Sequence, residues 1–274
     1  MNVEAVQMIM TLVGGLALFI FGMNFMSDGL QKAAGDKMRT ILAMLTRNPV
    51  LGVLAGALVT AVLQSSSATT VMVIGFVSAK LMKLPQAISI VLGANIGTTI
   101  TAQLIAFSIG DYAWAFVAVG FIMYFFFKKR EFVSYLGQTV FGFGVLFVGI
   151  NIMGDTMEPL AGSQVFLDLM MQVQDIPVLG VALGMCMTVI VQSSSATIAV
   201  LQNLASTAGP DGISSIISLH GALPILFGDN IGTTITAVLA SIGGSIAAKR
   251  TAAAHVIFNL TGTLLFIWFI PYYA

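Results

Sequence analysis

Long apolar segments separated by short polar or charged stretches dominate the chain. A helix needs about 20 mainly apolar residues to cross a bilayer. Taken with the charges at their ends, the apolar segments predict membrane-crossing helices over 12–25, 85–110, 113–127, 132–153, 213–247 and 252–270. The predicted fold is therefore an all-α polytopic membrane protein with six crossings.

Two further apolar segments, 50–79 and 177–205, carry a polar block near their centre. Each arm of the first segment is too short to cross a bilayer, and Arg47 and Lys80 place both of its ends on the same side. Such a segment enters the membrane and returns. We predict a re-entrant helical hairpin over 50–79, with Gln64-Ser65-Ser66-Ser67 at its tip, and a matching hairpin over 177–205.

The chain contains an internal duplication, visible as blocks that recur in the same order. The recurring sequences are Pro-Val-Leu-Gly-Val at 49–53 and 177–181, Gln-Ser-Ser-Ser-Ala-Thr at 64–69 and 192–197, and an Asn-Ile-Gly-Thr-Thr block within 93–102 and 228–237. We predict two membrane repeats, 1–130 and 131–274, each with one hairpin and one broken helix. The broken helices are expected over 85–110 and 213–247, with the interruption at the Asn-Ile-Gly-Thr blocks.

The charges of corresponding loops indicate that the two repeats are inverted. The basic residues of loop 27–48 are Lys32, Lys37, Arg39 and Arg47, whereas loop 154–176 has Asp155, Glu158, Asp168 and Asp175 and no base. Cytoplasmic loops are enriched in Lys and Arg, so the two loops should lie on opposite sides. This pattern is typical of inverted-topology repeats. We expect a multi-pass protein of the bacterial inner membrane with both termini outside.

Composition supports the membrane assignment and excludes other classes. Hydrophobic residues make up 58% of the chain and charged residues 8%, whereas soluble domains carry roughly 25% charge. The balance of 11 basic and 11 acidic residues leaves no basic field for nucleic acid. Cys186 is the single cysteine, which excludes an intrachain disulfide and a cysteine-based metal site. The N-terminus has no basic region before its apolar segment, so we expect a retained span and not a signal peptide.

The polar blocks have the chemistry of an anion site. The return arm of each hairpin begins past Ser66 or Ser194, so a helix N-terminus with unpaired N–H groups should face the protein centre. Serine hydroxyl groups add donors that suit a tetrahedral oxyanion. The candidate anion ligands are Ser65, Ser66, Ser67, Ser193, Ser194, Ser195, Thr98 and Thr233. We also expect Thr98, Thr99, Thr233 and Thr234 to cap the second half of each broken helix.

No Lys, Arg or His lies in these blocks, so bound cations should neutralise the anion. Sodium is the expected coupling ion, and no other cofactor or transition metal is expected. The candidate sodium ligands are Gln64, Gln192, Asn95, Thr99, Asp229, Asn230 and Thr234. Asp229 is an acidic residue expected at membrane depth, where charges are usually functional. The alternative for Asp229 is a structural pairing with a nearby hydroxyl or amide group.

These residues also have alternative roles. Small hydroxyl residues also let membrane helices pack closely, which is the structural alternative for the serine blocks. His220 and His255 have no counterpart in the other repeat, so neither is assigned to a proton relay. A serine nucleophile needs a base within reach, and no base is duplicated beside the serines. We therefore do not expect an enzyme.

The paired Gln-Ser-Ser-Ser-Ala-Thr blocks, each followed by Asn-Ile-Gly-Thr-Thr, resemble the type II sodium-dependent phosphate cotransporter family over about 18–270. The resemblance implies phosphate and sodium sites at Gln64 to Ser67 and Gln192 to Ser195. His255 to Asn259 is similar to a His and Phe-Asn segment of that family, which the first half lacks. The resemblance also implies that bacterial relatives often carry a PhoU-like regulatory domain, and we expect none in this chain. A separate PhoU-like regulator and a homodimer remain open.

The resulting hypothesis is a sodium-coupled symporter that imports inorganic phosphate by alternating access in a lipid bilayer. One alternative is sodium-coupled transport of another small oxyanion or a carboxylate. The other is a membrane sensor or scaffold that transports nothing.

Overall fold

The computed structural model describes residues 3–34, 48–106, 110–157, 168, 171–173, 175–209 and 211–273. Its helices are α1 (Val3–Ala34), α3 (Pro49–Leu63), α4 (Ser66–Ser78), α5 (Leu84–Ala106), η2 (Gly110–Tyr112), α6 (Ala113–Phe126), α7 (Glu131–Met157), α9 (Pro177–Val191), α10 (Ser194–Ser206), α11 (Leu219–Ser241), α12 (Ile246–Phe266), η4 (Ile267–Phe269) and α13 (Ile270–Tyr273). No strand occurs within these ranges, apart from an isolated bridge between Ala208 and Ser215. The predicted all-α class is confirmed. Loop residues Lys37, Arg39, Arg47 and Glu158 lie outside the described residues.

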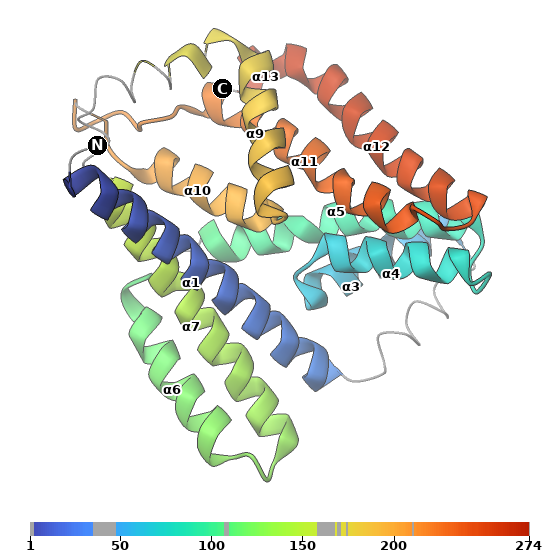
Figure 1. The fold of residues 1–274 in the computed structure, drawn as a ribbon, viewed down its shortest axis with the longest axis horizontal. Helices are drawn as coiled ribbons and strands as arrows, with labels where there is room; N and C mark the ends of the chain where they lie inside the picture. Colours follow the sequence, from blue (N-terminus) through green and yellow to red (C-terminus); the bar gives the residue numbers. More distant parts are fainter. Residues whose placement is uncertain are drawn as a thin grey trace.

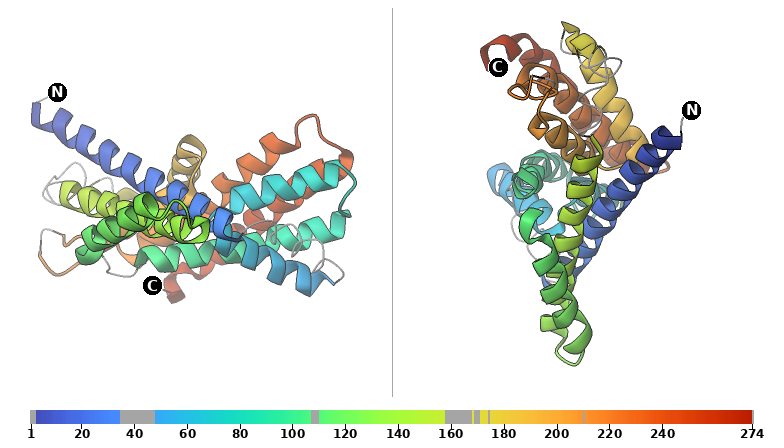
Figure 2. Two further views of the ribbon diagram at one scale, coloured as in Figure 1. Left: turned by 90° about the horizontal axis from the view of Figure 1, so that it is seen from below. Right: turned by 90° about the vertical axis from the view of Figure 1, so that its left-hand side faces the viewer.

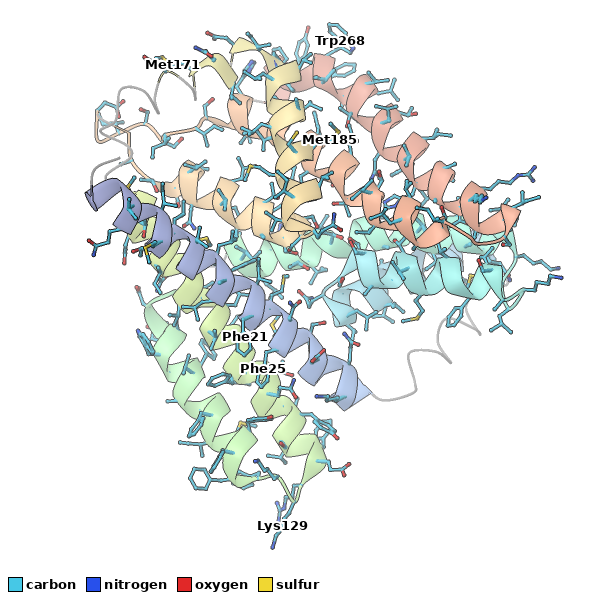
Figure 3. All side chains as sticks on the ribbon, viewed as in Figure 1. Phe21, Phe25, Lys129, Met171, Met185 and Trp268 are labelled. Atoms are coloured by element: carbon cyan, nitrogen blue, oxygen red, sulfur yellow. The ribbon has the colours of Figure 1, made fainter. Side chains whose placement is uncertain are left out.

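The helices form two groups that diverge from each other (Figures 1 and 2). In one group α1 runs along α7, and α7 also packs against α6. The other group contains the two helix pairs α3–α4 and α9–α10 together with α5, α11 and α12, and α5 crosses the middle of the molecule (Figure 1). Lys129 projects from the turn between α6 and α7, and Trp268 lies in η4, just past the end of α12 (Figure 3).

Five helical segments in the described part of the chain are long and apolar enough to cross a membrane: Val6–Ala33, Leu84–Ala106, Glu131–Thr156, Leu219–Ser241 and Ile246–Tyr272. The chain is therefore a multi-pass membrane protein. The sixth predicted crossing, 113–127, corresponds to α6, which has 14 residues. At 1.5 Å per residue α6 rises about 21 Å, less than the roughly 30 Å of a hydrocarbon core.

Close helix packing repeats between the two halves. A Cβ atom built on Gly56 of α3 would lie 2.0 Å from the Ile90 carbonyl oxygen of α5. The corresponding atom on Gly184 of α9 would lie 1.9 Å from the Ile225 carbonyl oxygen of α11. No side chain fits at either crossing, so both pairs of helices approach backbone to backbone. The duplicated sequence thus produces a duplicated packing.

The predicted breaks in the two long helices are wrong. α5 runs without interruption over Leu84–Ala106 and α11 over Leu219–Ser241, through both Asn-Ile-Gly-Thr blocks and past Pro224. The hydroxyl groups of Thr98, Thr99, Thr233 and Thr234 bond back to carbonyl oxygens of their own helices, at 3.2, 2.6, 3.0 and 2.7 Å. Such back-bonding satisfies a threonine inside a helix, so these residues do not act as caps.

The predicted span 213–247 is also too long, because its helix ends at Ser241. The next helix, α12, begins at Ile246, six residues before the predicted start at 252. Lys249 and Arg250 therefore lie in the first turns of α12 and not in a loop between two spans. Ser245 caps this helix, since its hydroxyl accepts from the Ala248 N–H at 3.2 Å.

Candidate functional site

The interruptions of the backbone lie at the tips of the two helix pairs. α3 ends at Leu63 and α9 at Val191, and the following residues, Gln64 and Gln192, adopt left-handed conformations with φ of 53° and 58°. A residue other than glycine pays roughly 1–3 kcal/mol in this region, and such strain clusters at functional sites. Both tips therefore hold the same unfavourable conformation directly before the serine block.

Both tips line one pocket of about 200 Å³, which we call the serine pocket. Its lining residues are Ile20, Met23, Asn24, Ser27, Gln64, Ser65, Ser66, Ser67, Thr98, Thr101, Val191, Gln192, Ser193, Ser194 and Ser195. The two Gln-Ser-Ser-Ser blocks, which lie far apart in sequence, thus meet at a single place. Thr98 joins them from α5, whereas its repeat counterpart Thr233 lies outside this lining.

Two helix N-termini open into the serine pocket. The hydroxyl of Ser65 accepts from the Ala68 N–H at 3.1 Å, and that of Ser193 accepts from the Ala196 N–H at 3.3 Å. These caps satisfy one N–H of each helix. The next N–H groups along the pocket wall are those of Ser66, Ser67, Ser194 and Ser195, and none bonds to another described residue. They remain available to a ligand.

The electrostatics of the serine pocket favour an anion. Each helix N-terminus carries roughly half a positive charge, and two such ends meet here. None of the residues that line the pocket is Lys, Arg or His. The attraction therefore comes from backbone dipoles and hydroxyl groups, and not from a basic side chain.

The glutamines at the tips present oxygen atoms. The Gln64 side-chain amide donates to the Ala61 carbonyl, and that of Gln192 donates to the Val189 carbonyl at 2.7 Å. A backbone carbonyl only accepts, so the amide nitrogen must face it and the amide oxygen must face away. The Gln64 Oε1 atom is buried and has no partner among the described residues. Buried amide oxygens are ligands for a hard cation.

Asp229 lies beside the serine pocket without lining it. It is 1% exposed, and its Oδ1 atom accepts a hydrogen bond from Thr188 at 2.5 Å. The Thr188 hydroxyl also lies 2.9 Å from that of Thr197, one turn beyond the Ser193 cap. The Asp229 Oδ2 atom has no partner within the described ranges. A buried carboxylate oxygen without a partner is costly, which makes this a candidate cation site.

The other predicted cation ligands lie away from the pocket. Asn95 donates to Asn259 at 2.8 Å, and its oxygen lies 3.1 Å from the His255 ring. Asn259 in turn donates to the Asn230 carbonyl at 2.7 Å. These bonds join α5, α11 and α12 into a polar network. Thr99 is exposed, and Thr234 is occupied by its own helix, so neither meets the serine block.

Several residues of the site were missed by sequence reasoning. Asn24, Ser27 and Thr101 line the serine pocket, and Thr188 and Thr197 contact Asp229 or each other. A signal existed for the threonine pair. Thr60 and Thr69 hold the corresponding positions of the first half, and their hydroxyl groups are also 2.9 Å apart. Thr69 and Thr197 end the recurring Gln-Ser-Ser-Ser-Ala-Thr blocks, and Thr60 and Thr188 recur outside them, so a position-by-position comparison of the repeats would have identified the pair. The same comparison shows that the counterpart of Asp229 is Ala94.

Comparison with known proteins finds one family in both halves. Residues 18–155 and 148–270 each match the family described as Na+/Pi-cotransporter. The double match agrees with the duplication in the sequence. No solved structure matches the chain.

Three relatives illustrate the similarity. The protein named uncharacterized protein YqeW of Bacillus subtilis (strain 168) is 35% identical over 93% of this chain and 80% of its own length. YjbB of Escherichia coli (strain K12), whose name proposes inorganic phosphate export, is 27% identical over 94% of this chain and 46% of its own length. The chain thus spans about half of YjbB. The human sodium-dependent phosphate transport protein 2B is 34% identical over 39% of this chain and 16% of its own length.

Proposed function

We propose that this chain, which belongs to the Na+/Pi-cotransporter family, couples the passage of inorganic phosphate through a membrane to that of sodium. The observation that carries the proposal is the serine pocket, where the N-termini of α4 and α10 meet. Open N–H groups and serine hydroxyls are donors, and phosphate oxygens are acceptors. The ligands we assign to phosphate are Ser65, Ser66, Ser67, Ser193, Ser194, Ser195 and Thr98.

Charge balance supports the coupling to sodium. Phosphate carries one or two negative charges near neutral pH, and no basic side chain lines the pocket. An unneutralised charge in a poorly solvated cavity is costly, so a cation that enters with phosphate lowers the free energy of both. We assign sodium to the amide oxygens of Gln64 and Gln192 and to the carboxylate of Asp229. Each has an oxygen that its hydrogen bonds leave free.

Four further residues keep weaker assignments. Asn95, Asn230, Thr99 and Thr234 stay proposed sodium ligands only if the long helices move during transport, because their present bonds point elsewhere. Thr233 likewise joins the phosphate ligands only after such a movement. Alternating access would include such a movement of the helices, since inverted repeats exchange conformations as the site opens to each side of the membrane in turn.

The direction of transport follows from the gradients. A symporter driven by an inward sodium gradient imports phosphate, and this is the direction we propose for a protein of the bacterial inner membrane. The name of YjbB, which proposes export, supports the opposite direction for that relative. Coupled carriers run either way when the gradients reverse, so the two directions need no difference in the site.

Uptake of radiolabelled phosphate into proteoliposomes tests the proposal. We expect uptake with an inward sodium gradient and little uptake with choline in place of sodium. Equal phosphate uptake in sodium and in choline would contradict the proposed coupling to sodium. Transport of only another oxyanion or a carboxylate would change the substrate, and no flux of any solute would favour a sensor or scaffold.

A further inference from the structure

A second cavity, of about 500 Å³, lies one helical turn from the serine pocket. α5 lines the serine pocket with Thr101 and this cavity with Ile105, and α10 lines them with Ser195 and Ala199. Four residues of helix rise about 6 Å. Ile105 and Ala199 belong to a buried apolar cluster with Phe147, which separates the two spaces. We call the second space the amide cavity.

The polar lining of the amide cavity consists of Asp111, Asn151, Gln202, Asn203 and Ser206. The three side-chain amides all donate to backbone carbonyls. Gln202 donates to Ala102 at 3.3 Å, Asn151 to Gly110 at 3.0 Å and Asn203 to Ile150 at 3.4 Å. Because a carbonyl only accepts, each amide nitrogen is fixed toward its partner and each amide oxygen is left over.

One of these oxygens is buried and lacks a partner. The Gln202 Oε1 atom forms no hydrogen bond with any described residue. Ser206 also uses its hydroxyl hydrogen on a backbone carbonyl, that of Asn203 at 3.1 Å. The amide cavity therefore offers acceptor oxygens and the Asp111 carboxylate, whereas the serine pocket combines the glutamine oxygens with serine hydroxyls and open N–H groups. The oxygen lining of the amide cavity suits a hard cation and not an anion.

From these contacts we infer that the amide cavity, beside the serine pocket, binds a monovalent hard cation, namely sodium. A single carboxylate, Asp111, balances one positive charge, and no basic residue lines the cavity. The amide oxygens of Gln202, Asn151 and Asn203 supply the remaining ligands. The contribution of this ion to transport rests on the proposed function, whereas its binding does not require phosphate.

The duplication shows that this chemistry is specific to one half. The positions that correspond to Gln202 and Asn203 in the first hairpin are Ile74 and Gly75. Ile74 is 2% exposed and packs in an apolar cluster with Ala237, Ala248 and Ala252. A cavity produced by the shared fold alone would recur there with a similar lining. The amides instead occur in one half of the protein, so sodium should bind in that half and not at the corresponding place in the other.

Equilibrium binding of radiolabelled sodium to the purified protein tests this inference, with choline chloride as background and no phosphate. We expect Gln202→Leu and Asp111→Asn each to weaken one class of sodium site by about tenfold, the effect of about 1.4 kcal/mol. Asp175→Asn removes an equal charge at an exposed position that lines neither cavity, and should leave binding unchanged.

The controls separate this site from the one at Asp229. Asp229→Asn should weaken a different class of sodium site, and its effect should add to that of Gln202→Leu. Asp111 is exposed at the cavity rim, so its replacement tests the site even if Gln202→Leu does not fold. Sodium binding that is unchanged in Asp111→Asn and in folded Gln202→Leu overturns the inference while leaving the proposed function intact. Sodium binding that responds to Gln202 but not to Asp229 overturns only the assignment of Asp229.

Discussion

Thr188 donates a hydrogen bond of 2.5 Å to the carboxylate of Asp229, in the interior of the second half of the protein. The first half keeps the threonine pair, Thr60 and Thr69, but has Ala94 in place of the acid. The two halves therefore share a scaffold and differ in charge at this point. Because the acid is confined to one repeat, replacing Asp229 tests the role of this charge directly.

Replacing Asp229 with Asn should weaken sodium coupling. The amide keeps the size of the side chain and removes the negative charge that we assign to sodium. We expect the sodium concentration for half-maximal phosphate uptake to rise by about tenfold or more, because the loss of about 1.4 kcal/mol of attraction between carboxylate and cation weakens binding tenfold. Unchanged sodium dependence in Asp229→Asn would assign the carboxylate to structure alone.

Replacing Ser66 or Ser194 with Ala should weaken phosphate transport. Each change removes one of the hydroxyl groups that we assign to a single anion in the serine pocket. The loss of one hydrogen bond to a charged ligand, about 1.5–3 kcal/mol, corresponds to about 10–100-fold in the apparent affinity for phosphate. Ser214→Ala, in an exposed turn, is the matched control. Wild-type uptake in both pocket variants would defeat the site assignment.

Replacing Gly184 with Ala should destabilise the protein. The new methyl group would meet the Ile225 carbonyl oxygen at 1.9 Å, so α9 and α11 would have to move apart. Overpacking of this kind costs about 1–3 kcal/mol. Gly75 also lies inside a helix, but nothing lies within 4 Å of an added Cβ atom there. Thermal unfolding in detergent should show a lower melting temperature for Gly184→Ala and none of this loss for Gly75→Ala.

Thiol labelling tests the proposed topology. In a Cys186→Ala background, Lys80→Cys should react with a membrane-impermeant reagent only from the cytoplasmic side, because basic residues flank that hairpin. Tyr112→Cys, before α6, should react only from the outer side. Both parent residues are exposed. Labelling of the two positions from the same side would contradict the predicted crossing of α5 between them.

The sequence predicted the hairpins closely. The segments expected over 50–79 and 177–205 correspond to α3–α4 and α9–α10, which cover Pro49–Ser78 and Pro177–Ser206. The sequence also predicted that both tips face the protein centre, whereas their meeting in one pocket is a finding of the structure. The serines were predictable because small polar residues stand out in an apolar chain.

The remaining features depended on contacts that sequence does not reveal. The prediction of helix breaks was wrong because the hydroxyl groups of Thr98 and Thr233 donate to carbonyl oxygens of their own helices. Composition does not reveal these hydrogen bonds. The partner of Asp229 lies 41 residues away on another helix. The oxygen lining of the amide cavity depends on which backbone carbonyl each amide meets, and so on the packed structure.

The central claim is that cations bound with phosphate, and not basic side chains, neutralise its charge in the serine pocket. Calorimetric titration of the purified protein with phosphate, in sodium chloride and in choline chloride, tests it most directly. Linkage requires each ligand to strengthen the other by the same factor. We predict phosphate binding at least about tenfold tighter in sodium, a coupling of about 1.4 kcal/mol or more. Phosphate binding of equal affinity in both salts would contradict the claim.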